Sequence, residues 1–157
     1  MTVLQSSPRI TPFLWFDSNA EQAAAFYVSV FPNSRLLGTH RRVVDDPSGS
    51  AGSVLTVAFE LDGLPFTALN GGPIFQFTPA ISFVVHCANQ QEIDHYWTQL
   101  TDGGSESQCG WLKDRFGLSW QIVPARLANL IGNPKAMQAM LQMKKLDIAE
   151  LERAAQS

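Results

Sequence analysis

The sequence predicts an α+β protein made of two similar halves, followed by a helical tail. A strand, a helix cap and an amphipathic helix occur twice, at an offset of 70 residues from Asn19 to Asn89. Each copy is followed by short strand-like segments separated by turn residues. One such half cannot bury the apolar face of its sheet alone, so we expect the two halves to pair.

The first half begins with an aromatic-rich apolar run over residues 11–16, which is typical of a strand. Ser18 to Gln22 has the composition of a capping box. Apolar residues then recur at helical spacing until Pro32-Asn33 ends the helix. Further strands are expected over 35–44, 54–61 and 66–69, with Asp62-Gly63 as a hairpin turn.

The second half repeats this order. Residues 81–87 are expected to form a strand, Asn89 to Glu92 a helix cap, and the following helix has its apolar face in the same phase. Two strands, over 109–113 and 118–123, then flank a hairpin turn. An alignment without gaps pairs Pro12 with Ser82 and Phe13 with Phe83.

The tail has a different pattern. Asn133-Pro134 and Asp147 are helix-cap signals, and Met137, Met140 and Leu141 form an apolar stripe that we expect to pack rather than to bind a ligand. We interpret residues 1–157 as a single domain. It consists of module one (8–70), module two (78–124) and a helical tail (125–157).

Composition excludes several classes of protein. Charged residues make up 16% of the chain, against about 25% in a typical soluble domain, and residues 63–91 contain none. That stretch is too rich in proline and glycine for a membrane helix, so we expect an apolar cleft or a subunit interface instead. The net charge of -3 argues against nucleic acid as a partner. The basic pair Arg41-Arg42 precedes two aspartates, which is typical of a solvated loop.

Two cysteines without a C-x-x-C motif, and a first segment without the apolar run of a secretory signal, predict a cytoplasmic protein with reduced thiols. The expected partners are a small-molecule ligand and a second copy of the chain, since the low charge suggests a homodimer. Neither nucleic acid nor a membrane is expected.

Several segments resemble the PhnB-like branch of the vicinal-oxygen-chelate superfamily, which is often labelled 3-demethylubiquinone 3-methyltransferase-like. The superfamily includes glyoxalase I, extradiol dioxygenases and bleomycin-resistance proteins. The matching segments are Ile10 to Phe16, Asn70 to Pro73, Cys109 to Asp114, Phe116 to Pro124 and Ala139 to Ile148. The resemblance implies two tandem βαβββ modules, curved antiparallel sheets around a cleft, and a homodimer.

Enzymes of this superfamily bind a divalent metal through His, Glu or Gln side chains, two from each module. The resemblance places these positions at Pro12, Thr67, Ser82 and Gln121. Proline has no donor atom and hydroxyls are poor transition-metal ligands, so only Gln121 could coordinate. We therefore expect no cofactor, with a divalent metal as the disfavoured alternative.

The candidates for the binding cleft are Phe16, Thr67, Ser82, His86, Trp111 and Gln121. His86 shares a strand face with Ser82 and is the best candidate for a general base, although a lone strand histidine is more often a hydrogen-bonded wall residue. Cys109 is a second catalytic candidate, a nucleophile if a neighbour lowers its pKa and a small buried hydrophobe otherwise.

Three functions are compatible with these residues. The first is a protein that binds a small hydrophobic or aromatic molecule in a cleft with a degraded metal site. The alternative is a lyase, isomerase or dioxygenase-like enzyme that holds a metal differently, with Gln121 and His86 among the ligands. A methyltransferase is disfavoured, because no glycine-rich turn opens a helix anywhere in the chain.

Overall fold

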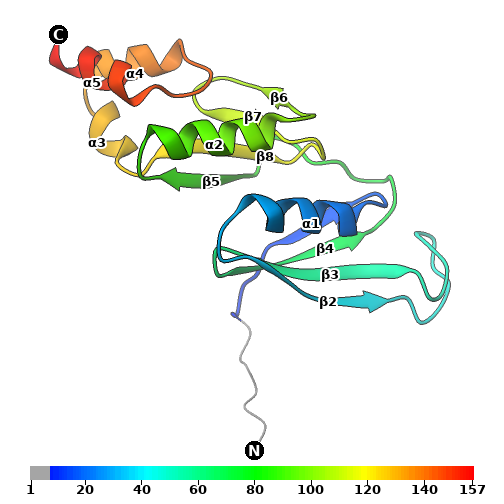
Figure 1. Ribbon diagram of the computed structural model, residues 1–157. Coiled ribbons are helices and arrows are strands. Elements are labelled where there is room, and N and C mark those ends of the chain that lie inside the picture. The colour runs from blue at the N-terminus through cyan, green and yellow to red at the C-terminus, as the bar shows by residue number, and fades with distance from the viewer. Residues whose placement is uncertain (1–7) are drawn as a thin grey trace, which may run out of the picture. The chain divides into compact units, whose positions relative to one another are not determined.

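The computed structural model describes residues 8–157, which form two compact units divided between Gln76 and Phe77. This boundary lies after the predicted end of module one, residue 70, and just before the predicted start of module two, residue 78. Each unit contains one four-stranded sheet with one long helix packed on it (Figure 1). Most of the segment used for the secretory-signal expectation lies outside the described residues.

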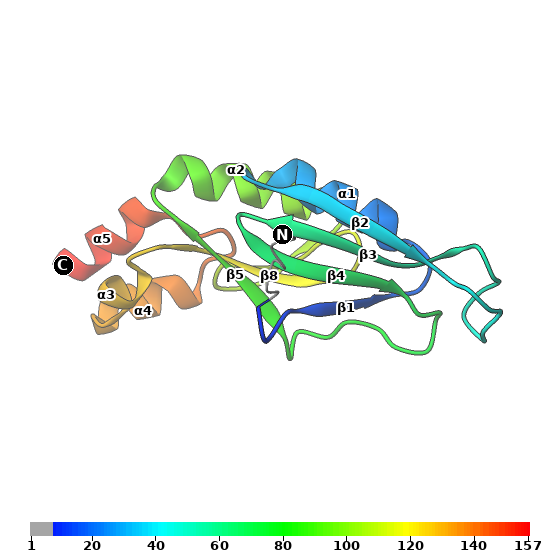
Figure 2. The same ribbon diagram turned by 90° about the horizontal axis from the view of Figure 1, so that it is seen from below.

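The first unit contains β1 (Phe13–Phe16), α1 (Ala20–Val30), β2 (Arg35–Arg41), β3 (Val54–Leu61) and β4 (Leu64–Asn70). The strand order is β1-β4-β3-β2, which Figure 2 shows side by side. Strand β1 runs parallel to β4, and the other pairs are antiparallel. The hairpin between β3 and β4 turns at Asp62 and Gly63, which both have positive φ, as a type I′ turn requires.

The core of the first unit lies between its sheet and α1. Alternate residues of β3 and β4 are buried, because successive side chains of a strand point to opposite faces. The rings of Phe59 and Phe66 stack at 5.3 Å, and Tyr27 of α1 stacks on Phe59 at 6.2 Å. Buried alanines, among them Ala23 and Ala24, let α1 lie close to these rings.

The second unit contains β5 (Ser82–Cys87), α2 (Gln90–Thr101), β6 (Ser105–Glu106), β7 (Trp111–Lys113) and β8 (Ser119–Pro124). The strand order is β5-β8-β7-β6, with β5 parallel to β8. Helix α2 buries Ile93, Trp97 and Leu100 against the sheet. Asn89 caps α2 by accepting a hydrogen bond from the amide of Glu92, as the capping signal predicts.

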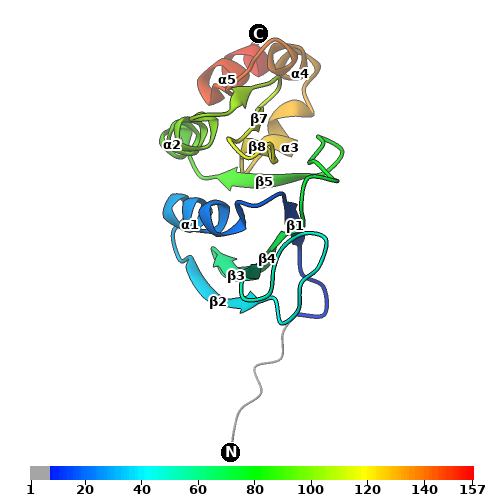
Figure 3. The ribbon, with the colours of Figure 1, turned by 90° about the vertical axis from the view of Figure 1, so that its right-hand side faces the viewer.

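The tail forms α3 (Leu127–Ile131), α4 (Pro134–Leu141) and α5 (Ile148–Gln156), and Figure 3 shows α4 and α5 side by side. Met140, Leu146 and Leu151 form a buried cluster with Val123 of β8, and Met137 and Met143 pack against it. The predicted packing role of the methionine stripe is therefore confirmed. The stripe serves this unit's own core, although Leu141 remains half exposed.

The predicted fold class is confirmed: the protein is α+β, with two similar modules and a helical tail. The sheets are mixed rather than purely antiparallel, because the first strand of each module inserts parallel to the last. The cap of α1 also differs from the prediction. The side chain of Asn19 makes no capping hydrogen bond, and Asn70 accepts from the amide of Ala20 instead, at 2.8 Å. Within residues 8–157, no helix combines the length and hydropathy needed to cross a membrane.

Candidate functional site

The candidate site lies on the helix-free face of the second sheet, by which we mean the side turned away from α2. Strand alternation places Ser82, Val84 and His86 of β5 on this face. On β8, Ser119 lies opposite Ser82 and Gln121 lies opposite Val84, so both belong to the same face. On β7, Lys113 lies opposite Ser119 and Trp111 lies opposite Gln121. Three predicted cleft residues of this module, Ser82, Gln121 and Trp111, are thus brought together.

Two neighbouring rows of side chains make up the polar part of this face. In one row, Gln121 Nε2 donates a hydrogen bond to Ser82 Oγ at 2.9 Å, and Trp111 lies across the strand from Gln121. In the next row, Ser119 lies between Ser82 and Lys113. A cavity of about 170 Å³, which we call the Trp111 pocket, is lined by Pro79, Ser105, Glu106, Ser107, Trp111, Leu112, Lys113 and Ser119.

Sequence reasoning missed Ser119 and Lys113. Ser119 could have been predicted from the sequence, because it is two residues from Gln121 and therefore lies on the same face of the strand. The turn over residues 114–117 then sets the hairpin register that pairs Lys113 with Ser119.

His86 lies on the same face but at its other end. It is paired with Val123, two residues beyond Gln121 on β8, and Val123 belongs to the cluster that the tail packs on. His86 does not line the Trp111 pocket. The general-base role thus receives no geometric support from this pocket, and it stays a prediction.

Both cysteines are packed into the second unit and its tail. Cys109 has a positive φ of 59° and packs against the tail cluster, and its amide donates to Met143 O. Cys87 is buried in the core of the second unit. Burial raises the pKa of the Cys87 thiol to about 12, and the negative charge of Glu92 adds to the shift. The Cys87 thiol therefore stays protonated at neutral pH.

In the first module, the candidates fall on opposite faces. Thr67 lies on the helix-free face of its sheet, across from Phe13. Phe16 is only 3% exposed and lies on the same face of β1 as buried Leu14, the face that packs against α1. The structure therefore corrects the placement of Phe16: it is a core residue and lines no cleft.

The metal-ligand position assigned to Pro12 also shifts by one residue. In the second module, Ser82 lies two residues before Val84, the partner of Gln121. The partner of Thr67 is Phe13, so the equivalent residue of the first module is Thr11, not Pro12. The cause is a strand-to-helix loop that is one residue longer in module one, which an alignment without gaps misses.

These four positions do not fit a divalent transition metal. Thr11, Thr67 and Ser82 offer neutral hydroxyls, and the amide nitrogen of Gln121 already donates to Ser82. Transition metals in proteins are held by imidazole, carboxylate or thiolate groups. Elsewhere in the described chain, residues 8–157, no three His, Cys, Asp or Glu side chains gather as a metal site would require.

The segment Asn70 to Pro73 supports the scaffold of the first module. The Asn70 side chain caps α1 and donates to Glu21 and to Val54 O. A Cβ on Gly71 would lie 2.3 Å from the ring of Trp15, and Trp15 Nε1 donates to Gly72 O at 3.0 Å. Only glycine at position 71 admits the indole.

The segment Cys109 to Asp114 supports the strand that carries Trp111. Gly110 has a φ of 85°, and a Cβ there would lie 2.9 Å from Ile122 O. Asp114, buried in the hairpin turn, accepts hydrogen bonds from two backbone amides and from Trp120 Nε1. These residues hold the hairpin on which the Trp111 pocket is built.

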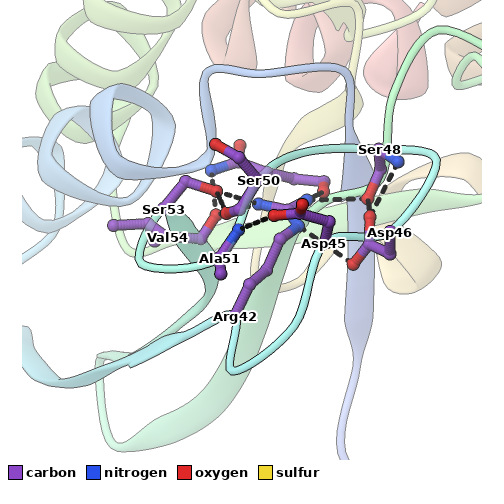
Figure 4. A network of polar contacts seen from close by, with 9 residues as sticks. Arg42, Asp45, Asp46, Ser48, Ser50, Ala51, Ser53 and Val54 are labelled. Atoms are coloured by element: carbon purple, nitrogen blue, oxygen red, sulfur yellow. Dashed lines mark hydrogen bonds and ion pairs between the residues drawn. The ribbon is translucent and has the colours of Figure 1, made fainter.

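A second cavity, of about 300 Å³, lies in the first unit beside a buried arginine, whose network of polar contacts is drawn in Figure 4. Arg42 is 5% exposed, which corrects the expectation of a solvated loop. Its five guanidinium hydrogen bonds go to Asp46, Ser53 Oγ, Val54 O, Ser48 Oγ and Asn70 O. A guanidinium has five donors, so Arg42 is fully used in tying the β2–β3 loop to β4 and has none left for a ligand.

Asp46, the carboxylate that accepts from Arg42, has a lowered pKa. Hydrogen bonds from the side chain and the amide of Ser48 hold the pKa of Asp46 below its ordinary value of 3.8, and Arg42 adds a smaller effect. Because the pKa of Asp46 is lowered in the folded state, its carboxylate stabilises the loop at any pH above the ordinary pKa. This stabilisation is lost as the pH falls through the lowered pKa.

The two βαβββ modules with their mixed sheets define a protein of the vicinal-oxygen-chelate fold. Solved structures agree with this fold. A protein from Pseudomonas aeruginosa is 19% identical, with 74% of this chain and 96% of that one covered and a TM-score of 0.60. The fosfomycin resistance protein FosX of Listeria monocytogenes, solved with Mn(II) and sulfate, is 16% identical, with 80% and 98% covered and a TM-score of 0.52.

A sequence model described as 3-demethylubiquinone-9 3-methyltransferase matches residues 8–123. The PhnB protein of Bacillus cereus is 34% identical, with 75% of this chain and all of that one covered (100%) and a TM-score of 0.68. The chain therefore belongs to the 3-demethylubiquinone-9 3-methyltransferase-like (PhnB) family, as the sequence predicts. A comparison with curated proteins found no match.

Proposed function

We propose that this protein binds a small hydrophobic or aromatic molecule, and that the site is the Trp111 pocket with the adjoining Ser82–Gln121 pair. The observation that supports this proposal most is the meeting of an indole, a cavity and a row of uncharged polar groups on one sheet face. Binding sites commonly combine apolar and aromatic walls with a few polar groups that orient the ligand.

The surroundings of the pocket favour binding over catalysis. Its polar groups are hydroxyls, one lysine and one carboxylate, and the carboxylate of Glu106 already accepts from Trp97 Nε1 at 2.9 Å. The histidine and the two cysteines, which would be the natural base and nucleophiles, lie outside the pocket lining. The proposed role is therefore to hold a compound rather than to transform it.

The proposal is tested by calorimetric titration with one-ring and two-ring aromatic compounds. Replacing Trp111 by Ala removes the aromatic wall, so we expect the affinity for the best compound to fall about tenfold or more. Phe75→Ala is the matched control, because Phe75 is an aromatic residue of the other unit, 61% exposed and outside the pocket lining. A loss of affinity in Phe75→Ala, with Trp111→Ala unchanged, contradicts the proposed location.

The alternative function, a metal-dependent enzyme, has a separate test. Metal analysis of protein purified without chelators is expected to find no stoichiometric divalent ion, because the donor set of hydroxyls and one amide suits none of them. One equivalent of zinc, nickel, iron or manganese per chain would favour the enzyme, with Gln121 and His86 as the first residues to replace.

The methyltransferase activity in the family's description is not part of this proposal. Both turns that lead from a strand into a long helix, residues 17–19 and 88–89, lack the glycine-rich sequence that cradles a nucleotide-like cofactor. Heat of binding on titration with S-adenosylmethionine would argue for that activity.

We further propose a cytoplasmic homodimer. Its support is the large apolar side chains that are exposed on the helix-free faces, Phe13 and Val84 among them, together with two free thiols. A second copy of the chain would cover such side chains. Sedimentation at micromolar concentration is expected to give the mass of a dimer, and a clean monomer contradicts this proposal.

A further inference from the structure

The Trp111 pocket contains a polar atom that the fold leaves unpaired. Ser119 is 1% exposed, and its Oγ has no hydrogen-bond partner within residues 8–157. Leaving a buried hydroxyl without a partner costs about 1–3 kcal/mol. Because Ser119 lines the pocket, a ligand there could supply the missing hydrogen bond.

The size of the pocket matches a single aromatic ring. A cavity of about 150 Å³ accommodates benzene in an engineered protein core. The Trp111 pocket, at about 170 Å³, is only slightly larger. Trp111 lines it together with Pro79, so an aromatic ring would find apolar and aromatic walls.

The burial of Ser119 Oγ favours a neutral polar group on that ring. Lys113 lies across the strand from Ser119 on the same face, whereas Glu106 is paired with Leu112 and accepts a hydrogen bond from Trp97 Nε1 of α2. A carboxylate ligand would have to give up its water shell to reach a hydroxyl as buried as that of Ser119, which is unfavourable. A hydroxyl carries no such cost, and it can both donate to and accept from Ser119 Oγ.

We propose that the Trp111 pocket is selective for a single aromatic ring bearing an uncharged hydroxyl, with Ser119 Oγ as the hydrogen-bond partner of that hydroxyl. This inference rests on the proposed function and adds to it the chemical class of the ligand. Ser119 is then the residue that determines specificity, while Trp111 supplies the wall.

The test compares phenol with toluene, which has the same shape but no hydroxyl. NMR titration, followed at the indole N–H of Trp111, is expected to show phenol binding about threefold to tenfold more tightly than toluene. In Ser119→Ala the two affinities should become equal, chiefly through weaker phenol binding. Ser29→Ala is the control, since Ser29 is an exposed serine of the other unit whose hydroxyl donates to Phe26 O; it should keep the preference.

A stability measurement separates this loss from damage to the fold. Since Ser119→Ala removes an unpaired buried hydroxyl, we expect its thermal midpoint to equal the wild-type value or to exceed it by about 2–4 °C. A large decrease would mean that the hydroxyl has a structural role, and would overturn the proposal.

The remaining outcomes also decide between the claims. Equal binding of phenol and toluene to the wild type, or tighter binding of benzoate than of phenol, overturns the inference and leaves the proposed function standing. The same holds if neither phenol nor toluene binds while a larger aromatic compound binds in a Trp111-dependent way. Failure of every aromatic compound removes the proposed function itself.

Discussion

Asp114→Asn is expected to lower the free energy of unfolding by about 3 kcal/mol. The side chain is 3% exposed, and its Oδ1 accepts from the amides of Phe116 and Leu118. Its Oδ2 accepts from Trp120 Nε1 at 2.8 Å. An amide of the same shape must direct its NH₂ group at one of these donors, so a buried hydrogen bond is replaced by a repulsive contact. Urea unfolding, followed by circular dichroism, measures the change.

The control for this variant is Asp102→Asn, since Asp102 is an exposed aspartate of the same unit that pairs with Arg115. Its effect should stay within about 0.5 kcal/mol. Because Asp114 lies in the turn between Trp111 and Ser119, Asp114→Asn should also weaken ligand binding. Equal stability of the two variants would mean that Asp114 does not organise this hairpin.

Arg42→Met is expected to lower the free energy of unfolding by about 2–4 kcal/mol. The methionine keeps much of the apolar stem but removes all five hydrogen bonds of the guanidinium. Two of the acceptors are backbone carbonyls, those of Val54 and Asn70, and the Val54 carbonyl keeps its hydrogen bond from Asn70 Nδ2. Because Asn70 also caps α1, the damage should reach the helix, and hydrogen exchange of the α1 amides should accelerate.

Arg41→Met is the matched control for this second prediction. Arg41 is the exposed neighbour, and within residues 8–157 its side chain makes one hydrogen bond, to Gly52 O. We expect a change within about 0.5 kcal/mol and no effect on α1. If both arginine variants unfold at the same urea concentration as the wild type, the buried network contributes nothing to the stability of the first unit.

Local signals were sufficient to predict most of the elements, but not the short strand β6 or the short helix α3. The apolar run that forms β1, the turn at Asp62-Gly63 and the caps at Asn89 and Asn133 depend on neighbouring residues, and the structure has them where they were expected. The packing of the methionine stripe followed from helical spacing alone. These features are readable in one sequence because their partners lie within a few residues.

The faces of the first strand could not be read in the same way. Side chains alternate at every residue, so one extra residue in the loop before α1 reverses which side chains meet the helix. This reversal moved Phe16 into the core and replaced Pro12 by Thr11. In the second module the expected face was right, and Ser82, Trp111 and Gln121 lie together.

The remaining surprises depend on contacts between distant residues. Asn70 caps a helix that begins fifty residues earlier, and Arg42 is buried only because acceptors converge on it from the β2–β3 loop and from β4. The unpaired hydroxyl of Ser119 is a property of packing that has no sequence signature. Such groups are found only when the fold is known.

If a small aromatic molecule binds at the Trp111 pocket, on the helix-free face of the second sheet, its binding will perturb the residues of that face. Backbone chemical-shift mapping with a panel of one-ring and two-ring aromatic compounds measures this perturbation. The predicted result is a set of shifts concentrated on Trp111, Lys113, Ser119 and Gln121, with the Trp111 indole among the largest. Shifts concentrated instead on the loop around Arg42 or on the tail helices, or no shifts at all, would contradict it.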